Sequence, residues 1–379
     1  MHRIAAVVAG LSLAFVGTSA TFAGTINVPG DYTLIQDAIN ASSDGDVINI
    51  AAGTYYEHSL NPSGKAITIQ GTLNGDGSLA TTIDAEQGGS VFNINSGEGN
   101  ETVIQHLVIT GGSGFEQDEF TYGGGICCFP NSIATISGCT ISENTANAGG
   151  GIYSSTNSNL TISSCTIKGN TASSHGGGIH HSRCSSTING CTISDNESAD
   201  AGGGIFCFQS SLNISSCKIE ANAALAYNQE GGDLVSGGGI FCFGTDATIT
   251  NCTIEGNSSY FAGDGIRCEF SSNATISGGS VCGSGPSPTY ADNSSNITSG
   301  LCWIDESCDG NLYIVIANQQ EQIDQLLTMH AQQQSAIEDL QQVITACCAE
   351  QSCAGDENND GVVDIHDLLI VISSWGACP

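Results

Sequence analysis

Six residues near the end of this 379-residue chain are spaced as oxygen ligands for one metal ion. They lie in DENNDGVVDIHD, residues 356–367, at positions 1, 3, 5, 7, 9 and 12 of a loop that would wrap a hard cation, and Gly361 stands at the sharp turn of position 6. The spacing predicts a Ca2+ site; the alternative is an acidic turn that binds no ion. Its ligands would be Asp356, Asn358, Asp360, the carbonyl of Val362, Asp364 and Asp367.

The calcium stretch resembles a dockerin type I repeat, because Asp rather than Glu occupies its twelfth position. The resemblance implies an EF-hand-like module over residues 349–379 that binds a cohesin-like or other surface partner. Dockerins normally contain two such repeats, whereas this chain has one. Cys353 and Cys378 flank it, and we expect a disulfide between them in place of the pairing of two repeats.

Aromatic side chains recur in a second pattern, since GGGIFCF occurs at 202–208 and again at 237–243. Neighbouring residues of a strand point to opposite sides, so an inward Ile205 places Phe206 and Phe208 outward. An outward aromatic stripe would offer ring faces to a sugar. Its glycan-binding candidates are Tyr153, His180, Phe206, Phe208, Phe241 and Phe243.

Acidic residues in two insertions, 111–122 and one within 223–236, would border this stripe. Paired carboxylates beside sugar-binding rings suit glycosidic cleavage. The acids in question are Glu116, Asp118, Glu119, Glu230, Asp233 and Asp264, with His175 and Arg267 nearby. The alternative is that the insertions pack on the aromatic rings and exclude water. For the histidines of SSHGGGIHHSRC, residues 173–184, we favour a structural role over a metal site, since His181 occupies an inward position filled elsewhere by Cys.

An internal repeat positions these side chains. Glycine triplets begin at residues 123, 149, 176, 202 and 237, and GDGIRC at 263 varies the motif. Columns of Ile (136 to 276), Cys (139 to 252) and Asn (144 to 257) keep step with the glycines, and NLTISSCTIKGN (159–170) alternates with the period of a strand. The repeat predicts an all-β solenoid, a parallel β-helix with coils of about 26 residues and three short strands each. We expect the cysteines to form a buried ladder, and the asparagines to turn the chain in a left-handed conformation while bonding to their stacked neighbours.

Two resemblances agree with this architecture. GGGI and CTISEN, recurring along the chain, resemble the repeat of polymorphic outer-membrane proteins, with Ile in place of that family's aromatic residue before Asn. VPGDYTLIQDAINASSDGDVINIAAGTYYE, residues 28–57, resembles the start of pectin-lyase-like right-handed β-helices. There Leu34, Ile35, Ala38 and Ile39 would form a short helix that caps the solenoid. The resemblances imply a right-handed parallel β-helix over residues 24–312.

A different pattern covers residues 313–348, which are rich in Gln. Ile316, Ile323, His330, Ile337 and Ile344 recur every seven residues, and this heptad spacing predicts an α-helical coiled coil through which copies of the chain would associate. The alternative is a helix folded back on the β-helix.

The N-terminus and the charge bound the location of the protein. Residues 1–23 have the basic start, apolar run and small residues of a secretory signal peptide, and no stretch is long enough to span a membrane. The 38 acidic and 6 basic residues give a net charge of −32, which argues against nucleic acid as a partner. The 18 cysteines all follow the signal, as suits an oxidising compartment. We therefore expect a secreted or cell-surface protein.

Two classes of function remain open on this basis. One is a scaffold or adhesion-type protein, oligomerised by its helix and anchored by its calcium module. The other is an extracellular polysaccharide-active enzyme, a glycoside hydrolase or lyase, that acts on a glycan along the β-helix. The sequence identifies no catalytic residues.

Overall fold

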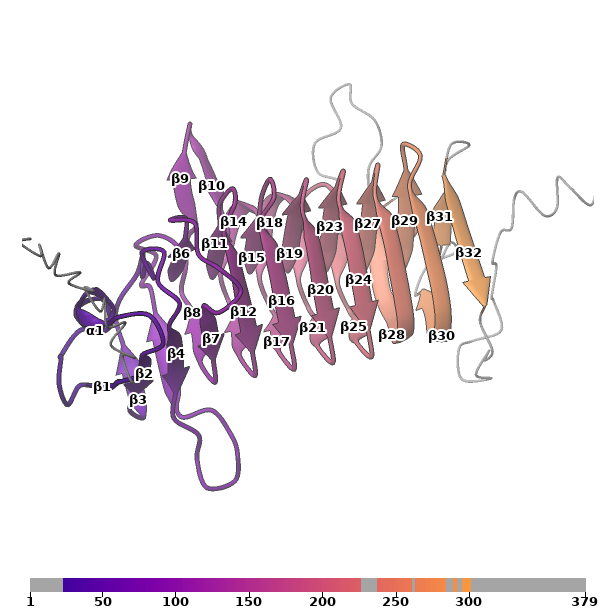
Figure 1. The fold of residues 1–379 in the computed structure, drawn as a ribbon. Helices are drawn as coiled ribbons and strands as arrows, with labels where there is room; N and C mark the ends of the chain where they lie inside the picture. The colour runs from indigo at the N-terminus through magenta and orange to yellow at the C-terminus, as the bar shows by residue number, and fades with distance from the viewer. Residues whose placement is uncertain (1–22, 226–236, 261–262, 284–288, 292–294, 301–379) are drawn as a thin grey trace, which may run out of the picture. The chain divides into compact units, whose positions relative to one another are not determined.

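The computed structural model describes residues 23–225, 237–260, 263–283, 289–291 and 295–300. The repeats form successive coils of a parallel β-helix, in which each strand pairs in register with the equivalent strand of the next coil (Figure 1). The predicted signal peptide falls almost wholly outside the described residues. The predicted coiled coil, the calcium loop, and Cys353 and Cys378 fall entirely outside them.

Each regular coil contains four short strands rather than the three predicted. We number the four faces in the order in which the chain forms them within one coil. The strand that follows the glycine triplet is counted as the fourth face. The first face contains β1 (Thr25–Val28), β2 (Val47–Ile50), β4 (Thr68–Gly71), β7 (Val103–Gln105), β12 (Ile133–Ser137), β16 (Asn159–Ser163), β20 (Ser185–Asn189), β24 (Ser211–Ser215), the start of β28 (Asp246–Ser259), β30 (Asn273–Gly283) and β32 (Asn296–Gly300). The second face contains β3 (Gly53–Tyr55), β5 (Thr81–Asp84), β8 (Val108–Thr110), β13 (Thr140–Ser142), β17 (Thr166–Lys168), β21 (Thr192–Ser194) and β25 (Lys218–Glu220).

The third face is the one that the three-strand expectation missed. It contains β14 (Thr145–Ala148), β18 (Thr171–His175), β22 (Glu197–Ser198) and β26 (Ala223–Ala224), together with the insertion strands β9 (Phe115–Gln117) and β10 (Phe120–Tyr122). The fourth face contains β6 (Phe92–Ile94), β11 (Ile126–Cys128), β15 (Ile152–Ser154), β19 (Ile179–Ser182), β23 (Ile205–Phe208), β27 (Ile240–Phe243), β29 (Ile266–Glu269) and β31 (Thr289–Ala291). The first three faces join in one sheet, and the fourth is a separate sheet.

Isoleucine columns fill the interior, as the alternating pattern predicts. Ile136, Ile162 and Ile188 are fully buried on the first face, and Ile152 and Ile179 are fully buried on the fourth. Because one coil presents the same inward side chains as the next, β-branched residues stack along the whole solenoid. This stacking explains why the sequence repeats.

An asparagine ladder connects the coils at the turn between the second and third faces. The side-chain amide Nδ2 of Asn170 donates to Asn196 Oδ1 at 2.9 Å and to the carbonyl of Ile141 at 2.9 Å. Asn196 repeats these bonds to Asn222 and Ile167, and all three asparagines are buried. The predicted bonding between coils is confirmed, but the predicted conformation is wrong. The preceding residue takes the left-handed conformation instead, with φ of 61° at Gly169 and 54° at Asp195.

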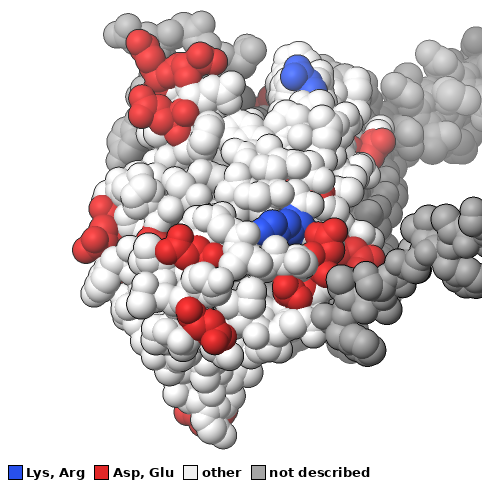
Figure 2. All heavy atoms as spheres, turned by 60° about the vertical axis from the view of Figure 1, so that its left-hand side comes forward, with Lys and Arg blue, Asp and Glu red and all other residues white. Residues whose placement is uncertain are grey.

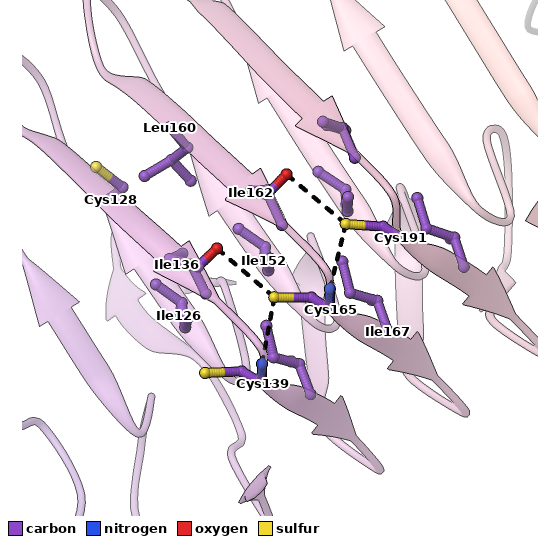
Figure 3. Close-up of a cluster of buried hydrophobic side chains, with 14 of the residues drawn as sticks. Ile126, Cys128, Ile136, Cys139, Ile152, Leu160, Ile162, Cys165, Ile167 and Cys191 are labelled. Carbon is purple, nitrogen blue, oxygen red and sulfur yellow. Dashed lines mark hydrogen bonds between the residues drawn. The ribbon is translucent and has the colours of Figure 1, made fainter. Parts of the chain in front are cut away.

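A ladder of stacked cysteines lies at the turn between the first and second faces, and its burial was predicted (Figure 3). Cys139, Cys165 and Cys191 are each 2% exposed, and the backbone N–H of Cys139 donates to Cys165 Sγ at 3.4 Å. The Cys165 thiol lies 3.6 Å from the carbonyl of Ile136 and the Cys191 thiol 3.7 Å from that of Ile162. The thiols therefore serve as buried hydrogen-bonding groups, and the pKa of Cys191 is raised to about 12, chiefly by its hydrogen bond with Cys165.

The glycine triplets allow close approach between coils. Gly149 has φ of 67°, and a Cβ on Gly150 or Gly151 would lie 2.5 or 2.6 Å from a carbonyl oxygen of the next coil. No side chain fits there, so the coil can turn only with glycine.

A short helix covers the N-terminal end of the solenoid. Helix α1 (Ile35–Ala41) buries Ile35, Ala38 and Ile39, which confirms the predicted cap. Leu34 was predicted to belong to this helix but immediately precedes it, and its side chain is 49% exposed. The Glu57 carboxylate accepts hydrogen bonds from the N–H groups of Ile35 and Gln36 and fixes the start of the helix.

Candidate functional site

The predicted aromatic stripe lies on the outward side of the fourth face, but most of it is closed. Tyr153 is 9% exposed, Phe206 is 6% exposed and Phe241 is fully buried, whereas His180 is half-buried. Open ring surface, which the glycan-binding prediction assumed, is therefore absent at Tyr153, Phe206 and Phe241. Their role in glycan binding stays a prediction, and it would require these rings to become uncovered.

The closure comes from stacking between coils. Parallel strand register places Tyr153, His180, Phe206 and Phe241 next to one another in successive coils. The His180 ring lies 5.1 Å from Tyr153 at 12° and 4.8 Å from Phe206 at 13°, and Phe206 lies 5.4 Å from Phe241 at 3°. Each inner ring has both faces against a neighbour. A sugar binds by lying on a ring face, so the column is built to join coils.

The first insertion seals the start of this column. Strands β9 and β10 form an antiparallel hairpin, and Tyr122 on it packs against Tyr153 with ring centroids 4.8 Å apart. Phe115 on the same hairpin meets Phe129 edge-on at 4.8 Å. The alternative that the insertion packs on the aromatic rings is thus confirmed for residues 111–122. Most of the second insertion lies outside the described residues.

A second aromatic column lies at the C-terminal ends of the fourth-face strands β23 and β27. Phe208 and Phe243 are half-buried and stack at 5.3 Å and 25°, and Phe243 stacks on Phe270 at 4.0 Å. The guanidinium of Arg183 covers the Phe208 ring at 5.3 Å. Phe270, which is 52% exposed, was not predicted, because it lies one residue beyond the column and joins it through a left-handed conformation with φ of 56°.

The histidines occupy the positions that their columns predict. His181 is 1% exposed inside the solenoid, where its Nδ1 lies 2.5 Å from Ser154 Oγ and burial lowers its pKa to about 4. Burial of the stacked His180 ring, followed by the nearby His175 and His181, holds its pKa well below the usual value. No group of three or more His, Cys, Asp or Glu side chains in the described part of the chain is arranged to hold a metal.

One polar group borders the closed stripe. Ser174 Oγ lies 2.5 Å from His175 Nδ1 and donates to Asp200 Oδ2 at 3.1 Å, and all three residues are half-buried. Burial lowers the pKa of His175, partly opposed by the Asp200 charge, so the imidazole is neutral at pH 7. The sequence prediction named His175 only as a neighbour of the stripe and missed Ser174 and Asp200, which adjacent coils bring together.

The predicted acidic groove is not assembled among the described residues. Glu116, Asp118 and Glu119 are exposed on the β9–β10 hairpin. The coils of β14, β18, β22 and β26 separate this hairpin from β28 and the following Asp264. Asp264 is 4% exposed and accepts a hydrogen bond from the N–H of Ser259 at 2.8 Å. Arg267 forms a buried ion pair with Glu269. Glu230 and Asp233 lie outside the described residues.

Most charged side chains on the face drawn in Figure 2 are acidic. Figure 2 shows separate groups of acidic side chains and few basic ones on the face turned to the viewer. Lys218 forms ion pairs with Glu220 and Glu255 at 2.7 and 3.2 Å. One of the few basic side chains is therefore already paired with acidic residues of the chain.

Comparison with known proteins identifies the architecture. The protein-family model for the right handed beta helix region matches residues 63–211 and 177–324 of this chain. No curated protein sequence matches the chain. Among the described residues, no helix is both long and apolar enough to cross a bilayer.

The solved structures that are similar to this chain include the following three. A pectin methylesterase from Aspergillus niger is 16% identical over 79% of this chain and 97% of its own, with a TM-score of 0.38. Pectate lyase Pel9A is 14% identical over 75% and 79%, with a TM-score of 0.43. A mannuronic acid specific polysaccharide family 6 lyase from human gut microbiota is 11% identical over 75% and 83%, with a TM-score of 0.30. At these identities the similarity concerns the fold alone.

Proposed function

The chain belongs to the right handed beta helix family, and from this premise we propose that it is a secreted or cell-surface scaffold of adhesion type. The rigid part is the β-helix. Residues 313–348 would oligomerise it, and the calcium module of residues 349–379 would anchor it to a cohesin-like or other surface partner.

The observation that supports a scaffold most strongly is the use of the outward aromatic residues. The rings of Tyr153, His180, Phe206 and Phe241 stack face to face on one another. The residues that looked best suited to bind a glycan therefore stabilise the contact between coils, as the asparagine and cysteine ladders do. Such a body is suited to holding attached modules at fixed spacing.

The experiment for this proposal measures the mass of the exported chain. Residues 24–379 and a variant lacking 313–348 are compared by size-exclusion chromatography with light scattering, with calcium and with EGTA. We expect a defined oligomer that becomes a monomer on deletion, and calcium-dependent ordering of residues 349–379 by circular dichroism. A full chain that stays monomeric at high concentration would overturn the oligomeric scaffold.

A second candidate function, a glycoside hydrolase or lyase, is favoured by the Ser174, His175 and Asp200 group. Ser174 Oγ lies 2.5 Å from His175 Nδ1 and 3.1 Å from Asp200 Oδ2, so proton transfer to the imidazole would require the hydroxyl hydrogen to turn from the carboxylate to the ring. The test is a comparison of His175→Ala with the unmodified chain on a panel of polysaccharides, with reducing ends and unsaturated uronates as the readout. Activity that His175→Ala abolishes would favour the enzyme, and equal activity would remove this group from consideration.

A further inference from the structure

The outward side of the first face carries a regular array of threonines. Thr135, Thr161, Thr187, Thr248 and Thr275 occupy one column, interrupted by Asn213, and the strand pairing places each directly beside its neighbour in the next coil. Apart from half-buried Thr135, these threonines are exposed. Strands β12, β16, β20, β24, β28 and β30 lie side by side in Figure 1. We propose that this face binds the surface of ice through its row of threonine side chains.

The threonine hydroxyls are available to an external partner. No hydrogen bond joins a side-chain hydroxyl of Thr161, Thr187 or Thr275 to another group within the described residues. Each β-branched side chain has few rotamers, so a hydroxyl and a methyl group face outward in a similar way from each coil. The column repeats at the strand spacing of about 4.8 Å, and alternate residues along a strand are about 6.7 Å apart. The result is a two-dimensional lattice of small hydrogen-bonding groups.

The neighbouring columns are tied from coil to coil, which holds the lattice in place. Asn273 Nδ2 donates to Asp246 Oδ1 at 2.9 Å, and Ser215 Oγ donates to Asn189 Oδ1 at 2.9 Å. Thr250 and Ser277 hydroxyls lie 3.3 Å apart. Side chains that are already ordered lose little freedom when a rigid surface meets them.

The absence of charge on this face separates it from the rest of the chain. Asp246 is the one charged residue among the outward positions of β12, β16, β20, β24 and the equivalent parts of β28 and β30. The chain as a whole has a net charge of −32. On the adjacent second face, Lys168, Lys218, Glu220 and Glu255 stand at outward positions. An uncharged strip within an acidic molecule does not select an ionic partner.

Ice fits this chemistry better than a soluble ligand. A dissolved molecule must displace water from each hydroxyl, and it gains little per bond. In ice the water is already immobilised, so each contact avoids most of the ordering cost of a bridging water. Many weak contacts spread over a regular array then add up. A sugar polymer would instead need ring faces to stack on, and the outward positions of the described first-face strands carry no aromatic residue from β12 to β30.

The test uses the exported chain, residues 24–379, labelled with a fluorophore and exposed to a single growing ice crystal. Thr161→Tyr/Thr187→Tyr places bulk on the face, and Thr171→Tyr/Glu197→Tyr is the matched control at exposed, paired positions of β18 and β22. Circular dichroism checks that both variants fold. We expect the unmodified chain and the control to adsorb to ice and inhibit recrystallisation, with at least a tenfold weaker effect for the first-face variant.

Two results would overturn the proposal. One is an unmodified chain that does not adsorb to ice or slow recrystallisation beyond serum albumin. The other is equal loss in both variants. Binding to crystalline cellulose or chitin without binding to ice would reassign the face to a solid polysaccharide. The oligomer measurement is independent, so either proposal can fail alone.

Discussion

The outward aromatic column of the fourth face and the outward threonine column of the first face repeat with the same period, yet one is closed and the other is open. Phe206 and Phe241 stack at 5.4 Å and are almost fully enclosed. Thr161 and Thr187 are exposed and paired only through their backbones. Outward direction in a strand therefore does not mean exposure, because large flat side chains at strand spacing satisfy one another whereas small polar ones leave their hydroxyls to solvent.

The strongest test of this difference is Phe241→Ala. Removing a fully buried ring from the stack should lower the free energy of unfolding by about 3–5 kcal/mol, from lost burial and the cavity left behind. Chemical denaturation of residues 24–379 measures it. The matched control is Phe120→Ala, since Phe120 is 54% exposed on the β9–β10 hairpin and should cost far less. Equal effects would show that the column does not support the solenoid.

Acidification should weaken the closed side of the solenoid through His181. Its folded pKa is about 4 because of burial, below the value of about 6.5 for an unfolded histidine. The unfolded chain therefore binds the proton more readily, and stability should be full above about pH 6.5 and fall by up to about 3 kcal/mol as the pH drops towards 4. Denaturation curves at pH 7.5 and 4.5 measure the change.

The control for this effect is His181→Cys, which places at residue 181 the side chain that its column has at Cys207 and Cys242. The variant should lose less stability between the two pH values than the unmodified chain. The same loss in both would assign the acid effect to other groups.

The asparagine ladder offers a smaller effect on stability. Asn196→Ala removes a buried amide and leaves the Nδ2 of Asn170 and the Oδ1 of Asn222 without that partner. We expect a cost of about 1–3 kcal/mol. Asn213→Ala, the same change at an exposed position of the first face, should be within about 0.5 kcal/mol of neutral. A neutral result at Asn196 would contradict the ladder.

The smallest expected effect concerns the open face. Thr187→Ser keeps the hydroxyl and removes one exposed methyl group, so the free energy of unfolding should change by no more than about 0.5 kcal/mol. Thermal unfolding followed by circular dichroism measures it. A loss above about 2 kcal/mol would show that the threonine column is part of the packing and not a free surface.

The sequence predicted the coil and its interior because both follow from the period. Ile162, Cys165 and Asn170 recur at fixed offsets, and parallel stacking requires equal side chains at equal positions. The same reasoning placed His181 inward, and the structure confirms it.

The surface was harder to predict, because exposure depends on what covers a strand. Tyr153 is enclosed by Tyr122, which an irregular hairpin brings from the previous coil. Phe270 joins the aromatic column only through a left-handed turn. The third-face strand was missed since its short segment, such as Glu197–Ser198, carries almost no alternation. Ser174 and Asp200 are separated by one coil, so only stacking brings them together.

The central claim is that the outward aromatic residues join coils and that the protein is a scaffold. The most direct measurement incubates residues 24–379, with calcium, with a broad panel of acidic and neutral polysaccharides, and records new reducing ends and unsaturated uronates. The scaffold account predicts no product on any of them. Product on one polysaccharide, lost on His175→Ala or Phe206→Ala in a chain that still folds, would contradict it.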